Sequence, residues 1–227
     1  MIEKNHNTIQ QNFKIPVSVV FLGPPASGKG TTASFLDEKF GYKPVSPGNI
    51  FKKIRTDKSE LSNLVIEATK NGGLCPDWLT NKIVKEESEK IILMGAKSIT
   101  LDGYPRTLEQ LEFLNCNFDV KLFVYATSNL NKLKTIVENR RNCRTCNKVF
   151  SCLHDFDCIN FDKEYCAKFS NINWEKRWDD DLDIFEKRFE VYNNETLPVI
   201  EEVSHYKNFI ELDLFDNSSY EKIIKTI

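Results

Sequence analysis

The chain has 227 residues, of which 41% are hydrophobic and 28% are charged, and its formal net charge at pH 7 is -2. This length and apolar fraction allow one α/β domain with inserted segments, or at most two small domains. A net charge so close to zero gives no bulk electrostatic reason to expect a nucleic-acid-binding protein, and no segment approaches the roughly 20 consecutive apolar residues that cross a membrane.

The N-terminus and the cysteines indicate the compartment. Residues 1–13 are polar and rich in Asn and Gln, and they lack both the apolar core of a signal peptide and the arginines of a transit peptide. They predict a disordered leader. Five of the seven cysteines gather between Cys143 and Cys166, which favours reduced thiols or a metal site over a secreted disulfide framework. We therefore expect an intracellular protein, cytoplasmic, with a mitochondrial location left open.

A phosphate-binding loop is the first functional motif along the chain. Gly-x4-Gly-Lys, with a hydroxyl residue within two positions, occupies Gly23–Thr31 between an apolar run and a helix predicted over Thr32–Lys39. Its glycines let backbone N–H groups surround an anion, and the helix points its positive end at the same place. We expect Lys29 to reach the β- and γ-phosphates of a nucleotide, and Thr31 to hold magnesium or one of its waters.

Short apolar segments separated by helical stretches predict a parallel sheet covered on both faces. The predicted strands are Val17–Leu22, Tyr42–Val45, Ser98–Leu101, Lys121–Tyr125 and Asn208–Leu212. The connection between the second and third strands is too long for a plain crossover. A helix opens there near Ser59 and stops at Gly72-Gly73, and Pro76 suits the first position of another helix. We interpret this excursion as an inserted subdomain.

A second motif, Asp102-Gly103-Tyr104-Pro105-Arg106, follows the third predicted strand. A carboxylate that organises magnesium belongs at the end of a buried strand close to a phosphate loop. Arg106, just past a rigid Gly-x-Pro turn, is placed to grip a phosphate with two parallel hydrogen bonds. A strand that ends in Asp is by itself as often structural as functional. The phosphate loop upstream favours the functional interpretation.

Together with Arg177-Trp178-Asp179-Asp180 and Arg188, these motifs resemble the adenylate kinase family of nucleoside monophosphate kinases, in order and spacing. The resemblance implies an α/β fold with a P-loop core of five parallel strands in the order 2-3-1-4-5. It divides the chain into a core of residues 14–45, 74–139 and 178–227, a helical monophosphate-binding insert of residues 46–73 and a lid insert of residues 140–177. The implied activity is phosphoryl transfer from Mg-ATP to AMP, giving two ADP, by a monomer without nucleic-acid or membrane partners.

The resemblance also implies a role for individual residues. Catalytic positive charge is expected from Lys29, Arg106, Arg140, Arg177 and Arg188. The triphosphate is expected on Gly23, Pro24, Ala26, Ser27, Gly28, Lys29, Gly30, Thr31, Thr32 and Arg140. The monophosphate is expected on Ser46, Gly48, Lys52, Arg55, Cys75, Gly103, Arg106, Gln110, Arg177 and Arg188. Magnesium is expected near Thr31 and Asp102. The acceptor oxygen is already anionic, so the mechanism needs no general base.

The expected lid contains the cysteine cluster. Many long lids of this family hold a structural zinc, and Cys143-Arg144-Thr145-Cys146 matches their first Cys-x2-Cys pair. A second such pair is absent, but Cys166 lies a few residues beyond the expected position. The open choices for the fourth ligand are Cys158, Cys152, His154 and Asp162. The alternatives are partly buried free thiols, or a nucleic-acid-binding knuckle, which the nearby acidic residues oppose.

Other positions depart from the family or allow a second interpretation. Adenylate kinases carry Ser-Thr-Gly-Asp-x-Leu-Arg where this chain has Ser46–Lys52, and the arginine that stacks on their donor base aligns with Ile136. A GTP:AMP phosphotransferase and a weakly active nucleotide-binding homologue therefore stay open.

A helix over Asp179–Tyr192 is predicted to bury Leu182 with the aromatic residues of its stripe. Arg188 on that helix is expected in the cleft, the alternative being a surface ion pair.

Overall fold

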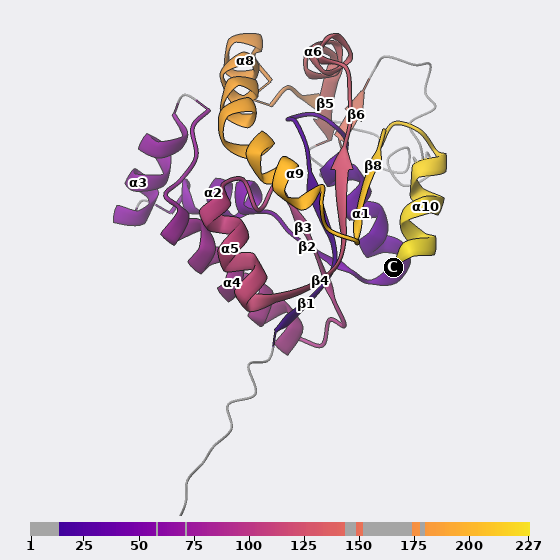
Figure 1. The fold of residues 1–227 in the computed structure, drawn as a ribbon. Coiled ribbons are helices and arrows are strands. Elements are labelled where there is room, and N and C mark those ends of the chain that lie inside the picture. Colours follow the sequence, from indigo (N-terminus) through magenta and orange to yellow (C-terminus); the bar gives the residue numbers. More distant parts are fainter. Residues whose placement is uncertain (1–13, 58, 71, 144–148, 152–173, 178–179) are drawn as a thin grey trace, which may run out of the picture.

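The computed structural model describes residues 14–57, 59–70, 72–143, 149–151, 174–177 and 180–227, and the structural statements below concern these residues. Its centre is a five-stranded parallel sheet in the order β2-β3-β1-β4-β8 (Figure 1). The strands are β1 Ile15–Leu22, β2 Lys43–Val45, β3 Ile99–Asp102, β4 Phe118–Ala126 and β8 Phe209–Leu212. Because β8 is the fifth strand of this sheet along the chain, the predicted order 2-3-1-4-5 is confirmed.

Helices cover both faces of the sheet, as expected for a parallel sheet whose central strands are buried on both sides. One core cluster joins the sheet to α4 (Asp77–Leu93), α5 (Leu108–Asn117) and α9 (Leu197–Val203). A second cluster joins the opposite face to α1 (Lys29–Phe40) and α10 (Ser218–Thr226). This arrangement leaves the carboxyl ends of the strands open to a cavity, where ligands bind in open α/β sheets.

The excursion between β2 and β3 is helical, as predicted. It consists of α2 (Pro47–Ile54) and α3 (Glu60–Thr69), followed by α4. The Ser59 side chain caps α3 by accepting the N–H of Ser62 at 3.2 Å. Pro76, expected as the first helical residue, is instead the N-cap of α4, because its ψ of 142° is extended.

A small antiparallel sheet, β6-β5-β7, was not predicted. β5 (Arg140–Cys143) directly follows α6 (Leu130–Asn139) and pairs with β6 (Val149–Ser151) and β7 (Trp174–Glu175). These strands are short, and β5 has the polar sequence Arg-Arg-Asn-Cys, so no alternation of apolar residues marks them. The pairing puts the beginning and the end of the expected lid insert side by side.

The helix that carries Arg188 begins later than predicted. α8 spans Leu182–Val191, with Asp181 as its N-cap, and a π-helical turn over Tyr192–Thr196 joins it to α9. Phe185 is 1% exposed and Tyr192 is 7% exposed, but Leu182 is 36% exposed, so its predicted burial is wrong. Leu182 is the first residue of the helix, before the stripe reaches the core.

Among the described helices, none combines the length and the apolar character that crossing a bilayer requires.

Candidate active site

The phosphate loop and the first turn of α1 form one side of the site. Gly28 caps α1 with a φ of 89°, a conformation that glycine adopts without steric cost. The Lys29 ammonium donates to the carbonyl oxygens of Gly23 at 3.1 Å and Pro24 at 2.6 Å, and to Ser27 Oγ at 3.0 Å. The lysine is thus held across the loop, with its charge beside the positive end of the helix.

The surroundings of Lys29 are strongly positive. The pKa of Lys29 is lowered from 10.5 to about 8, mainly by burial and also by the guanidinium groups of Arg106, Arg188 and Arg140. The carboxylate of Asp102 acts in the opposite direction. Like charges that lie close together disfavour the protonated form of the lysine. An anion bound among them would stabilise the charged forms of all these side chains.

The motif after β3 forms the floor of the site. Gly103 has a φ of 71°, and its carbonyl oxygen accepts the Arg106 Nε–H at 2.9 Å. A Cβ on Gly103 would stand 2.9 Å from Arg106 Nη2, so the glycine makes room for the guanidinium. Burial lowers the pKa of Arg106, and the Asp102 carboxylate opposes that shift. The motif therefore delivers one carboxylate and one guanidinium to the same edge of the sheet.

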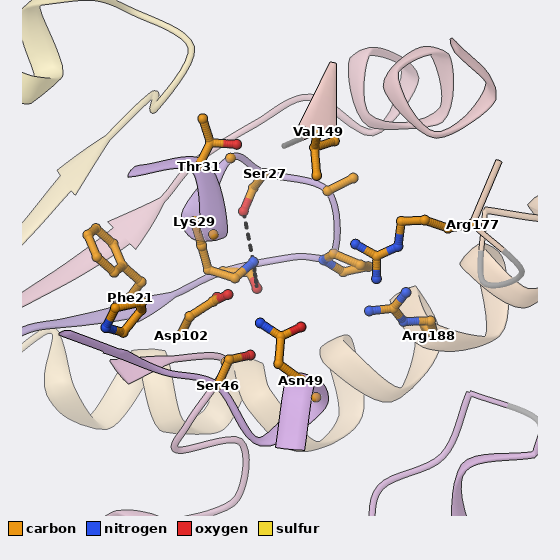
Figure 2. A pocket seen from close by; sticks show the side chains of 18 of the residues that line it. Phe21, Ser27, Lys29, Thr31, Ser46, Asn49, Asp102, Val149, Arg177 and Arg188 are labelled. Carbon is orange, nitrogen blue, oxygen red and sulfur yellow. Dashed lines mark hydrogen bonds between the residues drawn. The ribbon is translucent and has the colours of Figure 1, made fainter. Parts of the chain in front are cut away.

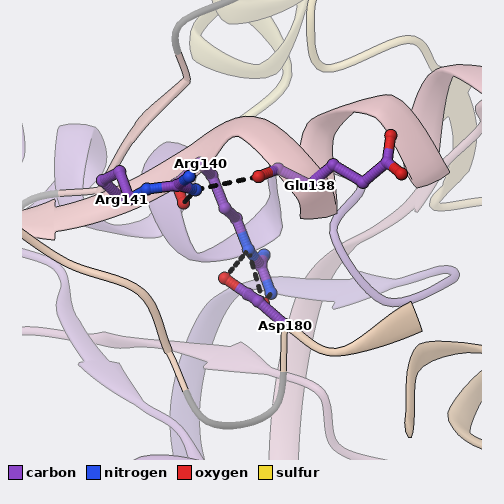
Figure 3. A network of polar contacts seen from close by, with 4 residues as sticks. All are labelled: Glu138, Arg140, Arg141 and Asp180. Carbon is purple, nitrogen blue, oxygen red and sulfur yellow. Dashed lines mark hydrogen bonds and ion pairs between the residues drawn. The ribbon is translucent and has the colours of Figure 1, made fainter. Parts of the chain in front are cut away.

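Arg140 and Asp180 form a buried ion pair across the chain (Figure 3). Arg140 Nε donates to Asp180 Oδ1 at 2.9 Å and to Oδ2 at 2.8 Å, and Nη2 also donates to Oδ1. Asp180 is 0% exposed and Arg140 is 9% exposed. The pair joins the start of β5 to the segment that leads into α8. Of the neighbouring motif residues, Trp178 and Asp179 lie outside the described residues.

Lys29, Asp102, Gly103, Arg106 and Arg140 line one cavity of about 1290 Å³. Figure 2 shows Lys29 between Ser27 and Asp102, with the guanidinium groups of Arg177 and Arg188 extending toward the same space from the other side. The lysine and arginine residues along its described lining are Lys29, Lys52, Lys53, Arg55, Arg106, Lys132, Arg140, Lys176, Arg177 and Arg188. The acidic ones are Glu87, Asp102 and Glu175. The cavity is therefore suited to polyanionic ligands.

Most of the residues expected to bind substrate are in this cavity. Its lining includes Gly23, Ala26, Ser27, Gly28, Gly30, Thr31, Ser46, Gly48 and Gly103, besides the cations and Asp102. Pro24 and Thr32 are not part of the lining: Pro24 accepts from Lys29, and Thr32 Oγ1 donates to the Gly28 carbonyl oxygen at 3.2 Å. Cys75 and Gln110 line a smaller recess beside it.

Several lining residues were missed by sequence reasoning. Lys132 stands on α6 with its ammonium 4.5 Å from the centre of the Phe215 ring and 3.0 Å from Asp213 Oδ2. Tyr192 and Thr196 reach the cavity from the π-helical turn. No local pattern marks these residues, because α6, the end of β8 and the α8–α9 helix meet only in the folded chain.

Comparison with known proteins identifies the family. The family model described as adenylate kinase matches residues 21–210. The chain belongs to the adenylate kinase family. Curated adenylate kinases from Orientia tsutsugamushi (strain Ikeda) and Thermosipho melanesiensis are 36% and 34% identical to it, over 94% and 93% of this chain and 96% and 97% of theirs. An adenylate kinase from Mycoplasma genitalium is 29% identical over 92% of this chain and 94% of its own length.

Membership of the adenylate kinase family makes the chain a phosphotransferase. Within the described residues, no three His, Cys, Asp or Glu side chains come together as a group that could hold a metal. Of the four cysteines predicted to bind zinc, Cys146, Cys158 and Cys166 lie outside the described residues. Only the backbone of Cys143 is described, at the end of β5.

Proposed function

We propose that this protein transfers the γ-phosphoryl group of ATP to AMP, reversibly and with Mg²⁺ on the ATP, giving two molecules of ADP. The observation that carries this proposal is the size and charge of the cavity. Its volume of about 1290 Å³ exceeds the roughly 300–1,000 Å³ of a typical single-ligand pocket. Two nucleotides that repel each other need positive charge on both sides, and basic side chains come from several segments around the cavity.

The proposed reaction is an in-line displacement at phosphorus. The bond from the γ-phosphorus to a phosphate oxygen of AMP forms, the bond to the β–γ bridging oxygen breaks, and that electron pair stays on the departing ADP. No proton moves, since the attacking oxygen is already anionic. The protein must position the two anions and balance their charge, which we assign to Lys29, Arg106, Arg140, Arg177 and Arg188.

We assign the two phosphate sites to opposite parts of the cavity. The triphosphate is placed on the phosphate loop and the first turn of α1, with Pro24 and Thr32 as supports that hold the loop. The monophosphate is placed near Ser46, Gly48, Lys52 and Arg55, with Arg106, Arg177 and Arg188 between the two sites and Cys75 and Gln110 in the recess.

The described residues fit a magnesium ion. A Cβ on Gly30 would stand 3.2 Å from Asp102 Oδ2, so this carboxylate lies against the phosphate loop, and Thr31 follows on the same cavity wall. Mg²⁺ prefers such oxygen ligands and takes few from protein, the rest coming from substrate phosphates and water. Held by Asp102 and Thr31 together with ATP, the ion neutralises charge on the β- and γ-phosphates.

We keep the predicted domain limits as a proposal, with a core of 14–45, 74–139 and 178–227 and inserts of 46–73 and 140–177; the leader predicted over 1–13 lies outside the described residues. Two observations support the two inserts. α2 and α3 lie between the end of β2 and the start of α4, and β5 and β7 pair where the second insert begins and ends. The predicted monomeric state and intracellular location, cytoplasmic or mitochondrial, stay predictions.

We propose further that the second insert binds one structural zinc ion through Cys143, Cys146, Cys166 and Cys158. The support is the Cys-x2-Cys spacing of the first pair, which suits a tetrahedral site. Elemental analysis of the purified protein should give one zinc per chain, and Cys146→Ser should abolish it. The matched control is Cys116→Ser, because Cys116 is an exposed thiol on α5. Zinc-free wild-type protein would exclude the metal.

Activity measurements with each pair of nucleotide donor and acceptor test the proposed reaction. ATP with AMP should give the highest kcat/KM. Lys29→Met and Arg106→Ala should lower turnover by about 10³-fold or more, because charge stabilisation supplies most of the catalysis. Lys82→Ala is the control, since this lysine is exposed on α4 and pairs only loosely with Glu86, at 3.9 Å. Near wild-type rates for either site variant would refute the assignment.

The two alternative functions gain no support from the described geometry. Both were motivated by the departures of Ser46–Lys52 and Ile136 from the family pattern, and the relatives named above are all adenylate kinases. GTP in place of ATP, tested in the same assay, distinguishes the donor.

A further inference from the structure

A hydrogen-bond network lies behind Arg106, and it begins with a residue that the proposed mechanism does not use. Asp77 is the first residue of α4. Its Oδ1 accepts from Gln110 Nε2 at 2.6 Å, and its Oδ2 accepts from Thr107 Oγ1 at 2.9 Å. Gln110 Oε1 in turn accepts the backbone N–H of Arg106 at 2.8 Å. Asp77 is thus linked to the main chain of Arg106 through a single side chain.

A neighbouring contact holds the same turn of α5. Asn81, four residues after Asp77 and so on the same face of α4, accepts from the Tyr104 hydroxyl at 2.7 Å. That hydroxyl is also 3.2 Å from the Gln110 carbonyl oxygen. Tyr104 is 0% exposed and Gln110 is 2% exposed. Both the main chain and the side chain of Gln110 are therefore fixed from α4 and from the motif after β3.

The chemistry of the partners allows only one orientation of the Gln110 amide. An ionised carboxylate can only accept hydrogen bonds, and a backbone N–H can only donate one. The amide nitrogen must therefore face Asp77, and the amide oxygen must face Arg106. The reverse orientation would bring two acceptors together at one end and two donors together at the other, leaving buried polar groups unpaired.

The fixed amide borders a recess of the main cavity. Gln110, Cys75 and Arg106 line a small space of about 40 Å³. The recess shares Gly48, Phe51, Gly73, Leu74, Gly103 and Arg106 with the large cavity. After its two network bonds, the amide retains one N–H and one oxygen lone pair. A ligand base that enters the recess meets a donor and an acceptor whose order is already set.

We propose that Asp77 is a positioning residue that locks the Gln110 amide in one orientation and thereby selects a 6-aminopurine monophosphate over a 6-oxopurine one. This inference rests on the proposed function. A 6-aminopurine offers an amino donor beside a ring-nitrogen acceptor, whereas a 6-oxopurine offers a carbonyl acceptor beside a ring N–H donor. For a base that enters the recess in one orientation, the two purines therefore present opposite orders of donor and acceptor to the amide.

Kinetics with AMP and IMP, at saturating ATP, test the lock in the full-length protein. Asp77→Ala should lower the ratio of kcat/KM for AMP to that for IMP by about tenfold, which is the effect of one misaligned hydrogen bond. Most of the change should be in KM for AMP. Asp77→Asn should keep the ratio within about twofold of wild type, because its oxygen can still accept from Gln110 and its NH₂ group can donate to Thr107. Lys82→Ala, on the same helix, should leave the ratio unchanged.

Two results would overturn the inference: a folded Asp77→Ala protein that keeps the wild-type ratio, or an Asp77→Asn protein that loses it equally. A second measurement needs no variant. In the nucleotide-free wild-type protein, NMR should show slowed solvent exchange for the Gln110 side-chain N–H that donates to Asp77, and rapid exchange of both side-chain N–H protons would refute the lock. If wild type does not phosphorylate AMP, the proposed function fails, while the NMR result still decides the orientation of Gln110.

Discussion

The Gly103→Ala substitution tests the effect of Arg106 placement on turnover separately from the stability of the fold. The φ of Gly103 is 71°, and the new Cβ would stand 2.9 Å from Arg106 Nη2. Alanine in this left-handed conformation costs about 1 kcal/mol, and the side-chain clash adds little, because the end of an arginine can move. An ordinary contact needs about half an ångström more, so the guanidinium must shift by roughly that amount. Since a misplacement of about 1 Å can cost 100-fold, we expect kcat to fall by about tenfold or more.

Gly41→Ala is the matched control. Gly41 ends α1 with the same φ of 71°, and no atom lies within 4 Å of the position of its Cβ. Both variants should therefore lose about 1 kcal/mol of unfolding free energy, or about 2–4 °C in Tm. Only Gly103→Ala should lose turnover in a coupled assay with ATP and AMP. If the two variants kept equal kcat values, the reasoning about Arg106 would be wrong.

Three further predictions concern charge. The kcat/KM for ATP should fall as pH rises through about 8, where Lys29 of the nucleotide-free protein loses its proton. Lys29→Arg should move this fall to higher pH. A flat profile up to about pH 9.5 would contradict the prediction. The unfolded chain keeps the Lys29 proton up to its ordinary pKa of 10.5. Between about pH 8 and 10.5 the unfolded state therefore binds more protons than the folded state, and the free energy of unfolding should rise with pH. Asp180→Ala should lower the urea-unfolding free energy by about 3–5 kcal/mol, since it leaves the buried Arg140 without its carboxylate. The exposed pair of Lys134 and Glu186 supplies the control: Glu186→Ala should cost under about 1 kcal/mol, and equal losses would refute the argument.

The sequence was sufficient for those parts of the site that depend on local spacing. The phosphate loop and the Asp102–Arg106 motif each keep their residues within a few positions, so their chemistry is visible before folding. The strands of the main sheet were predicted to within three residues at each end, because they are short, mostly apolar segments between helical stretches.

What the sequence did not reveal depends on contacts between distant segments. Asp77 is an unremarkable first-turn carboxylate until α4 packs against α5 and brings it to Gln110. Lys132 gains its place only when α6 lies next to the end of β8. The three strands of the small sheet are too short and polar to produce an apolar period, and Leu182 was placed on a buried stripe one turn before that stripe begins.

The pairing of β5 with β7 also has a consequence for how this chain tolerates change. Cys143 is opposite Trp174 in the ladder, so the thirty residues between them leave and re-enter the enzyme through a stem of β5 and β7, with β6 paired along the other side of β5. The length of the segment between β5 and β7 places no strain on the rest of the chain, because the two strands already hold its ends side by side. Grafts or length variants between those two positions should therefore be accommodated without moving the strands that carry the phosphate loop.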